Sequence, residues 1–154
     1  MTHNGTILNA DYLFHRFGFG RHAQVDSEII GRIADASIVG GRIDMRALRE
    51  RLTLCRGQMS AVIVAKTDPE TVVILKGNKP LELIYHPKLH AVFYASSAKY
   101  LQAALSDAKG WKRRPIEPMR ISVFPCSDLQ GFQLQPFSFV AQTRGSLLKG
   151  GVPV

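Results

Sequence analysis

The sequence predicts an α+β fold in which helices cover antiparallel β-sheets. The first third of the chain carries three segments with helical spacing of apolar residues, and the middle carries short β-branched runs separated by turns. Helices and strands are therefore segregated along the chain, whereas a parallel α/β fold would alternate them. A length of 154 residues with 45% apolar residues is sufficient for one domain with its own core.

Each of the three N-terminal helices begins with a residue whose side chain can cap free N–H groups. The expected caps are, in chain order, Asn9, then Asp26 or Ser27, then Asp44. The Gly18-Phe19-Gly20 segment ends the first helix, and Gly40-Gly41 forms a loop after the second. Apolar residues at helical spacing give each helix one buried face. They are Tyr12, Leu13, Phe14 and Phe17 in the first helix, Ile29, Ile30 and Ile33 in the second, and Met45, Leu48 and Leu52 in the third.

The strands follow in series. We expect strands at 59–65, 71–75, 81–85 and 89–95, and two more at 121–124 and 132–140. Short turns at 67–70 and 77–80 force antiparallel neighbours, so the first four strands are expected as a meander whose first two members are buried on both faces. Ser96 or Ser97 caps a fourth helix that carries Leu101 and Leu105. The first helices are expected to lie on one face of the sheet.

Composition excludes several classes of function. No apolar run reaches the roughly eighteen residues that a membrane span needs, and no signal peptide is recognised, so we expect a cytoplasmic protein. The net charge of +8 permits nucleic-acid binding, but the charge is scattered except at 109–114, which is interpreted as a solvated loop. Cys55 and Cys126 are too few for a disulfide framework and are expected to be small buried side chains. The five histidines lack metal-ligand spacing, so no metal and no cofactor is expected.

Five short motifs occur in a fixed order along the first two thirds of the chain. They are His3-Asn4-Gly5-Thr6-Ile7-Leu8-Asn9, Asp26-Ser27-Glu28-Ile29-Ile30, the run from Gly57 to Val64, Gly77 with Pro80-Leu81, and Ala95-Ser96-Ser97 with Leu101. In this order and on these elements the motifs resemble the glutaminase domain of class II glutamine amidotransferases, an N-terminal-nucleophile (Ntn) hydrolase family. The resemblance covers about residues 2 to 105 and implies an αββα sandwich of two antiparallel sheets between helix layers, here N-terminally truncated.

The resemblance also implies roles for three residues. The Asn4 side-chain amide and the Gly5 backbone N–H would be catalytic donors that stabilise the negative oxygen formed when glutamine is attacked. Asp26 would bind the α-ammonium group of glutamine. From the residues alone, Asn4-Gly5 also fits a hairpin turn, and Asp26 also fits a helix N-cap.

The chain departs from the family pattern in lacking the segment with the catalytic Cys and the substrate-binding Arg. We therefore expect residues 1–142 to be the remainder of a glutaminase domain, followed by a flexible tail at 143–154. The ancestral reaction would be hydrolysis of glutamine to glutamate and ammonia, and the isolated chain is expected to be inactive. Thr2, exposed if Met1 is removed, is a less favoured alternative nucleophile.

Two other readings stay open at this point: a non-catalytic scaffold or regulatory relative, and a basic nucleic-acid-binding module that uses Trp111 to Arg114. The expected partners are glutamine and either a synthetase or acceptor protein or the missing N-terminal segment, with a homo-oligomer as a further option. A membrane is not expected as a partner, and nucleic acid is not favoured. Apolar sheet faces and open strand edges are expected to be covered by a partner chain.

Overall fold

The computed structural model describes residues 1–106, 108–128, 131 and 133–143. The helices and the long central strands follow the segregated order that the sequence predicts, whereas a strand before the first helix and a hairpin between the second and third helices are not predicted. The helices are α1 (Ala10–Phe17), α2 (Glu28–Asp35), α3 (Met45–Leu52) and α4 (Ala98–Ala104). Within the described part of the chain no helix is long and apolar enough to cross a membrane.

The larger sheet is six-stranded and mainly antiparallel. Its path is β1 (Thr2–Ile7), β4 (Arg56–Ala65), β5 (Asp68–Lys76), β9 (Arg120–Pro125) and β10 (Gln133–Pro136). The short β11 (Val140–Ala141) adds to β4 in parallel at Arg56 and Gly57. Strand β1 is thus one edge of this sheet and β10 is the other.

A second sheet has three antiparallel strands in the order β7 (Ala91–Ala95), β6 (Glu82–His86) and β8 (Lys112–Arg113). Strands β2 (Ile38–Val39) and β3 (Arg42–Ile43) form a separate hairpin across Gly40-Gly41, both of which have positive φ. The sequence predicted only a loop at this pair of glycines. The two positive φ angles suit the tight hairpin turn that twisted strands require.

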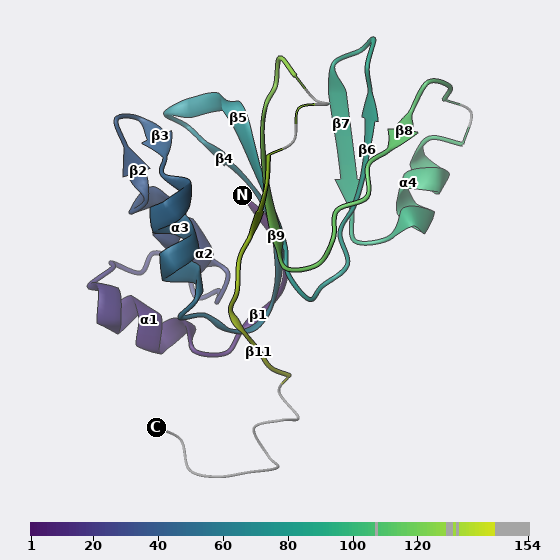
Figure 1. Cartoon of the computed structure of the whole chain (residues 1–154). Helices are drawn as coiled ribbons and strands as arrows, with labels where there is room; N and C mark the ends of the chain where they lie inside the picture. Colours follow the sequence, from purple (N-terminus) through teal and green to yellow (C-terminus); the bar gives the residue numbers. More distant parts are fainter. Residues whose placement is uncertain (107, 129–130, 132, 144–154) are drawn as a thin grey trace.

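The elements pack in layers. One apolar core joins α1, α2 and α3 to residues such as Met59, Ala61 and Leu75 of the larger sheet. Alternate residues of the same strands, including Val62, Ile74 and Phe124, face a second core that also contains Leu83 and Tyr85 of β6. Figure 1 shows the three helices on one side of the larger sheet and the smaller sheet with α4 on the other. Burial of β4 and β5 on both faces, as predicted, follows from this placement.

The expected four-strand meander is wrong, because β5 and β6 belong to different sheets. The connection at 77–80 is tied to β4. The Met59 N–H donates to the Asn78 side chain (3.0 Å), and the Ser60 hydroxyl donates to the Lys79 carbonyl (2.6 Å). The chain then leaves the first sheet, and β9 takes the place beside β5 that the meander assigned to β6.

The predicted helix caps are confirmed at α3 and α4. The Asp44 carboxylate accepts from the N–H groups of Arg46 and Ala47, and the Ser97 hydroxyl accepts from that of Lys99. Asn9 precedes α1 as predicted but does not cap it with its side chain. That side chain donates to the Leu54 carbonyl (2.9 Å) and accepts from the Arg56 N–H (2.8 Å), so it links β1 to β4.

Of the expected tail at 143–154, residues 144–154 lie outside the described residues. The expected strand at 132–140 is divided into β10 and β11, and Phe132 is likewise outside the described residues. Cys55 is buried as predicted, whereas Cys126 is only partly buried.

Candidate functional site

The Asn4-Gly5 pair lies inside strand β1 and not in a hairpin turn, so the turn alternative is wrong. Gly5 has φ +144°, and a Cβ placed on it would lie 2.0 Å from the Gln58 carbonyl oxygen. Gly57 on the partner strand has φ +136°, and its Cβ would lie 2.1 Å from the Thr6 carbonyl oxygen. Only glycine fits at both positions, because any side chain would collide with the facing backbone.

The register of β1 determines which of its backbone groups are free. The Leu8 N–H donates to the Arg56 carbonyl of the neighbouring strand (2.8 Å). N–H groups of an antiparallel strand point alternately toward and away from the neighbour. The N–H groups of His3, Gly5 and Ile7 therefore point to the outer edge of the sheet. The Gly5 N–H therefore faces away from β4, and Gly5 itself is partly buried.

Asp26 lies against the same edge. Its Oδ2 accepts a hydrogen bond from the Ile7 N–H (2.5 Å), two residues along β1 from Gly5. It does not cap α2, because Ser27 occupies the N-cap position and makes no side-chain cap bond. The helix-cap alternative for Asp26 is therefore wrong. The carboxylate instead occupies the Ile7 N–H, so that the outward N–H groups of β1 before Ile7 are those of His3 and Gly5.

Asn4 points to the opposite face of β1, toward the smaller sheet. Its Nδ2 donates to the Pro80 carbonyl (3.1 Å), and it lines a hollow of about 300 Å³ together with Thr2, Ser60 and Tyr94. The structure therefore brings Gly5 and Asp26 to one strand edge and places the Asn4 amide on a different face. The catalytic roles of Asn4 and Gly5 and the ligand role of Asp26 stay predictions.

His3 lies beside these residues, although the sequence analysis assigns it no role in the site. Burial lowers the pKa of the imidazole, while the Asp26 charge and the Gln58 backbone carbonyl raise it in part. Its Nε2 is buried without a hydrogen-bond partner. Alternation along β1 was the available signal, because it places His3 on the same side of the strand as the buried Ile7.

Within the described ranges, the other reactive groups do not form a second site. Burial raises the pKa of the Cys55 thiol to about 12, so this cysteine is not a thiolate at neutral pH. The Thr2 hydroxyl donates to the Tyr94 hydroxyl (3.0 Å). Among the described residues no group of three or more His, Cys, Asp or Glu side chains could hold a metal ion.

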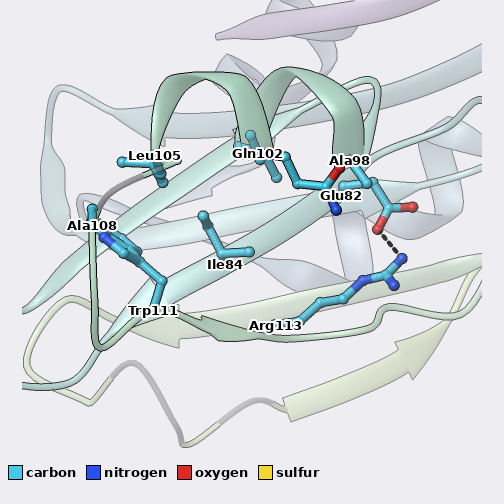
Figure 2. Close-up of a pocket in the computed structure, with 9 residues that line it drawn as sticks. Glu82, Ile84, Ala98, Gln102, Leu105, Ala108, Trp111 and Arg113 are labelled. Atoms are coloured by element: carbon cyan, nitrogen blue, oxygen red, sulfur yellow. Dashed lines mark hydrogen bonds and ion pairs between the residues drawn. The ribbon is translucent and has the colours of Figure 1, made fainter.

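A separate cavity of about 270 Å³ lies between α4 and the smaller sheet. Figure 2 shows Leu105, Ala108 and Trp111 at one end of the cavity and the Glu82–Arg113 ion pair (2.6 Å) at the other, with Ile84 between them. The Trp111 ring also contacts Phe93, with ring centroids 4.8 Å apart. The described walls are mainly apolar, and the Glu82 and Arg113 charges are paired with each other, so the described lining offers no free charged group.

The basic cluster at 109–114 includes Arg113, the cation of this ion pair. Arg113 is engaged by Glu82, and the Arg114 N–H donates to the Leu83 carbonyl (2.9 Å), which holds this segment along β6. Lys112 and Arg113 thus form a short strand of the smaller sheet, β8, where the sequence predicted a loop, and both are exposed, as predicted for a solvated segment.

No family profile matches the chain. Three curated relatives do, all named as synthases. The chain is 26% identical over 148 residues, which is 96% of its length, to the 7-cyano-7-deazaguanine synthase of Saccharolobus solfataricus. It is 31% identical over 107 residues, 70% of its length, to the 7-cyano-7-deazaguanine synthase of Sulfolobus acidocaldarius. It is 28% identical over 108 residues to 7-cyano-7-deazaguanine synthase 2 of Sulfurisphaera tokodaii. The chain spans about a quarter of the length of these relatives: 27%, 22% and 23%.

These relatives correct the interpretation as a class II glutamine amidotransferase. Their names describe a synthase of 7-cyano-7-deazaguanine, not a glutaminase, an Ntn hydrolase, a scaffold or a nucleic-acid-binding module. Assignment to that family, glutamine hydrolysis as the ancestral reaction and glutamine as a partner are therefore wrong. The motifs have local structural reasons: Gly5 and Gly57 allow close approach of two strands, and Asp26 binds a strand N–H.

Proposed function

We propose that this chain is a working part of a 7-cyano-7-deazaguanine synthase. The observation that carries the proposal is the similarity to the Saccharolobus solfataricus synthase along 96% of the chain. Because the chain spans about a quarter of that relative, the complete reaction is proposed for an assembly in which further polypeptide acts together with this chain.

Asn4, Gly5 and Asp26 are proposed to lie where this chain meets the rest of the synthase. Three features support this placement. Gly5 offers a backbone donor at an open sheet edge, Asp26 limits that edge, and Asn4 lines the hollow beside it. His3, which is partly buried and whose ring Nε2 has no hydrogen-bond partner, lines the same hollow.

We propose also that the layers are those of an Ntn-type αββα sandwich. The support is the spatial order of the layers: three helices, two mainly antiparallel sheets and α4, with neighbouring layers joined by an apolar core or by direct packing.

A cytoplasmic location is proposed as well, and fractionation of the source cells tests it.

A chimera tests the proposed function. In the Saccharolobus solfataricus synthase, the stretch that matches this chain is replaced by residues 1–142, and the chimera is produced in cells that lack their own synthase. We expect 7-cyano-7-deazaguanine to be detected by mass spectrometry. The control is the same synthase with the matched stretch deleted, which is expected to give none. A folded chimera that accumulates like the parent but makes no product would contradict the proposal.

A further inference from the structure

We propose that the outer edge of β1 is a docking site for an extended polypeptide segment from the part of the synthase that this chain does not span. The segment adds a strand beside His3 and Gly5 and places apolar side chains into hollows between the two sheets. The inference rests on the proposed function for the identity of the segment. The edge itself is a feature of this chain.

The first support is the unpaired backbone of β1. Among the described residues, β1 pairs with β4 and no other strand of the larger sheet lies along its outer edge. The N–H groups of His3 and Gly5 point outward, and that of Ile7 is already bound by Asp26. A free strand edge is a template for another strand, and addition of a peptide to a sheet edge is a common mode of recognition.

The second support is the apolar surface beside this edge. A hollow of about 210 Å³ lies between the sheets, lined by residues that include Val64, Val72, Val92 and Tyr94. It shares Thr2, Val62 and Tyr94 with the hollow of about 300 Å³ next to Asn4, so the two adjoin along β1. Val64 and Tyr94 are 47% and 39% exposed, which leaves apolar surface that a docked segment would cover.

The third support is the contrast with the opposite edge of the same sheet. On β10 the Phe137 N–H donates to the Met119 carbonyl, so the intervening position 136 faces outward, and that position is a proline. Proline at an outward position removes a donor and blocks the addition of a strand. The β1 edge has no such protection, since glycine occupies the equivalent outward position at residue 5.

The fourth support is the length of the relatives. The chain matches only 27% of the Saccharolobus solfataricus synthase, so the remaining three quarters of such a protein are a source for the segment. A second copy of this chain is the other possible occupant. It is less favoured because Asp26 limits the free edge to a short stretch around His3 and Gly5, and the apolar hollows beside it are concave.

Peptide binding tests the docking site. Fluorescent overlapping peptides that cover the unmatched part of the Saccharolobus solfataricus synthase are titrated with this chain, and binding is measured by fluorescence anisotropy. We expect one peptide, or neighbouring overlapping peptides, to bind. His3→Pro removes an outward donor without removing a bond to β4, and it is expected to weaken binding about tenfold or more. Leu134→Pro, at an outward position of β10, is the matched control and is expected to leave binding unchanged.

A second pair of variants guards against misfolding of His3→Pro. Val64→Lys places a charge in the apolar hollow from an exposed position, and Val39→Lys makes the same change on the remote β2–β3 hairpin. We expect Val64→Lys to abolish binding and Val39→Lys to preserve it. Absence of binding by every peptide, binding that ignores both His3→Pro and Val64→Lys, or dimerisation of this chain through β1 in light scattering would each overturn the proposal. These outcomes are independent of product formation by the chimera.

Discussion

A single methyl group at Gly5 tests the close approach of β1 and β4. In Gly5→Ala the new Cβ would lie 2.0 Å from the Gln58 carbonyl oxygen. Cβ atoms in proteins essentially never approach another heavy atom more closely than 3.0 Å. The strands would have to separate by about 1 Å, which weakens hydrogen bonds whose ordinary length is about 2.9 Å. In addition, φ +144° is a conformation that non-glycine residues adopt at a cost of about 1–3 kcal/mol.

We expect Gly5→Ala to lower the free energy of unfolding by about 2–4 kcal/mol, since about 1 kcal/mol of weakened hydrogen bonding adds to the backbone strain. For a domain of this size that corresponds to a fall in Tm of about 5–15 °C. Urea unfolding followed by circular dichroism gives the free energy, and differential scanning calorimetry gives Tm.

Gly31→Ala is the matched control. Gly31 lies within α2, and a Cβ there would meet nothing within 4 Å. Alanine is the better helix former, so this variant is expected to be about 0.5–1 kcal/mol more stable than the wild type. If Gly5→Ala unfolded within about 0.5 kcal/mol of the wild type, the reasoning about the β1–β4 contact would be refuted.

Three further predictions concern the same surface and the core. Asp26→Ala leaves the Ile7 N–H without its acceptor and is expected to lower the free energy of unfolding in urea by about 1–3 kcal/mol. Asp26→Asn keeps an acceptor oxygen and is expected to recover part of this loss. If Asp26→Ala had no larger effect than the same change at the exposed Asp35, the prediction would be contradicted. In native protein at about pH 8, mass spectrometry is expected to find iodoacetamide on Cys126 well before Cys55, because burial raises the pKa of Cys55 to about 12, and equal labelling rates would disagree. Burial lowers the pKa of His3 below 6.5, so the unfolded chain binds the proton more tightly, and the free energy of unfolding falls as the pH drops through 6.5 toward the folded-state pKa. His3→Gln is expected to reduce this loss between about pH 7 and pH 5, whereas the same change at the exposed His90 is not. Parallel curves of unfolding free energy against pH for the wild type and both variants would count against this assignment.

Local chemistry explains why much of the fold could be predicted. Asp44 and Ser97 cap their helices because a short polar side chain next to an apolar helical stripe has few other partners. The sequence predicts buried strands at 59–65 and 71–75 because nearly every side chain in these segments is apolar or β-branched. The layers then follow, since an apolar helix face and an apolar sheet face must cover each other.

The parts that sequence reasoning missed depend on contacts between distant residues. Residues 2–7 form a strand only because Gln58 and its neighbours lie beside them, and nothing within that short polar segment indicates the pairing. The sequence predicts Asn9 and Asp26 as helix caps, but each side chain binds backbone groups far along the chain. Asn9 binds the Leu54 carbonyl and the Arg56 N–H, and Asp26 binds the Ile7 N–H.

The identity of the candidate site shows the same limit. Short motifs such as Asn4-Gly5 and Asp26-Ser27-Glu28 are compatible with oxyanion and ligand chemistry, but the same residues are required by strand packing and edge capping. Similarity to relatives over 70% to 96% of the chain therefore carries more functional information than these short motifs do. All of them lie on or against β1.

The cellular pool of 7-cyano-7-deazaguanine tests most directly the proposed role of this chain in the synthesis of that compound. The gene for the chain is disrupted in its own source cells, and 7-cyano-7-deazaguanine is quantified by liquid chromatography and mass spectrometry before and after the gene is restored. We expect the pool to be lost on disruption and to return on restoration. An unchanged pool in the disrupted cells would contradict it.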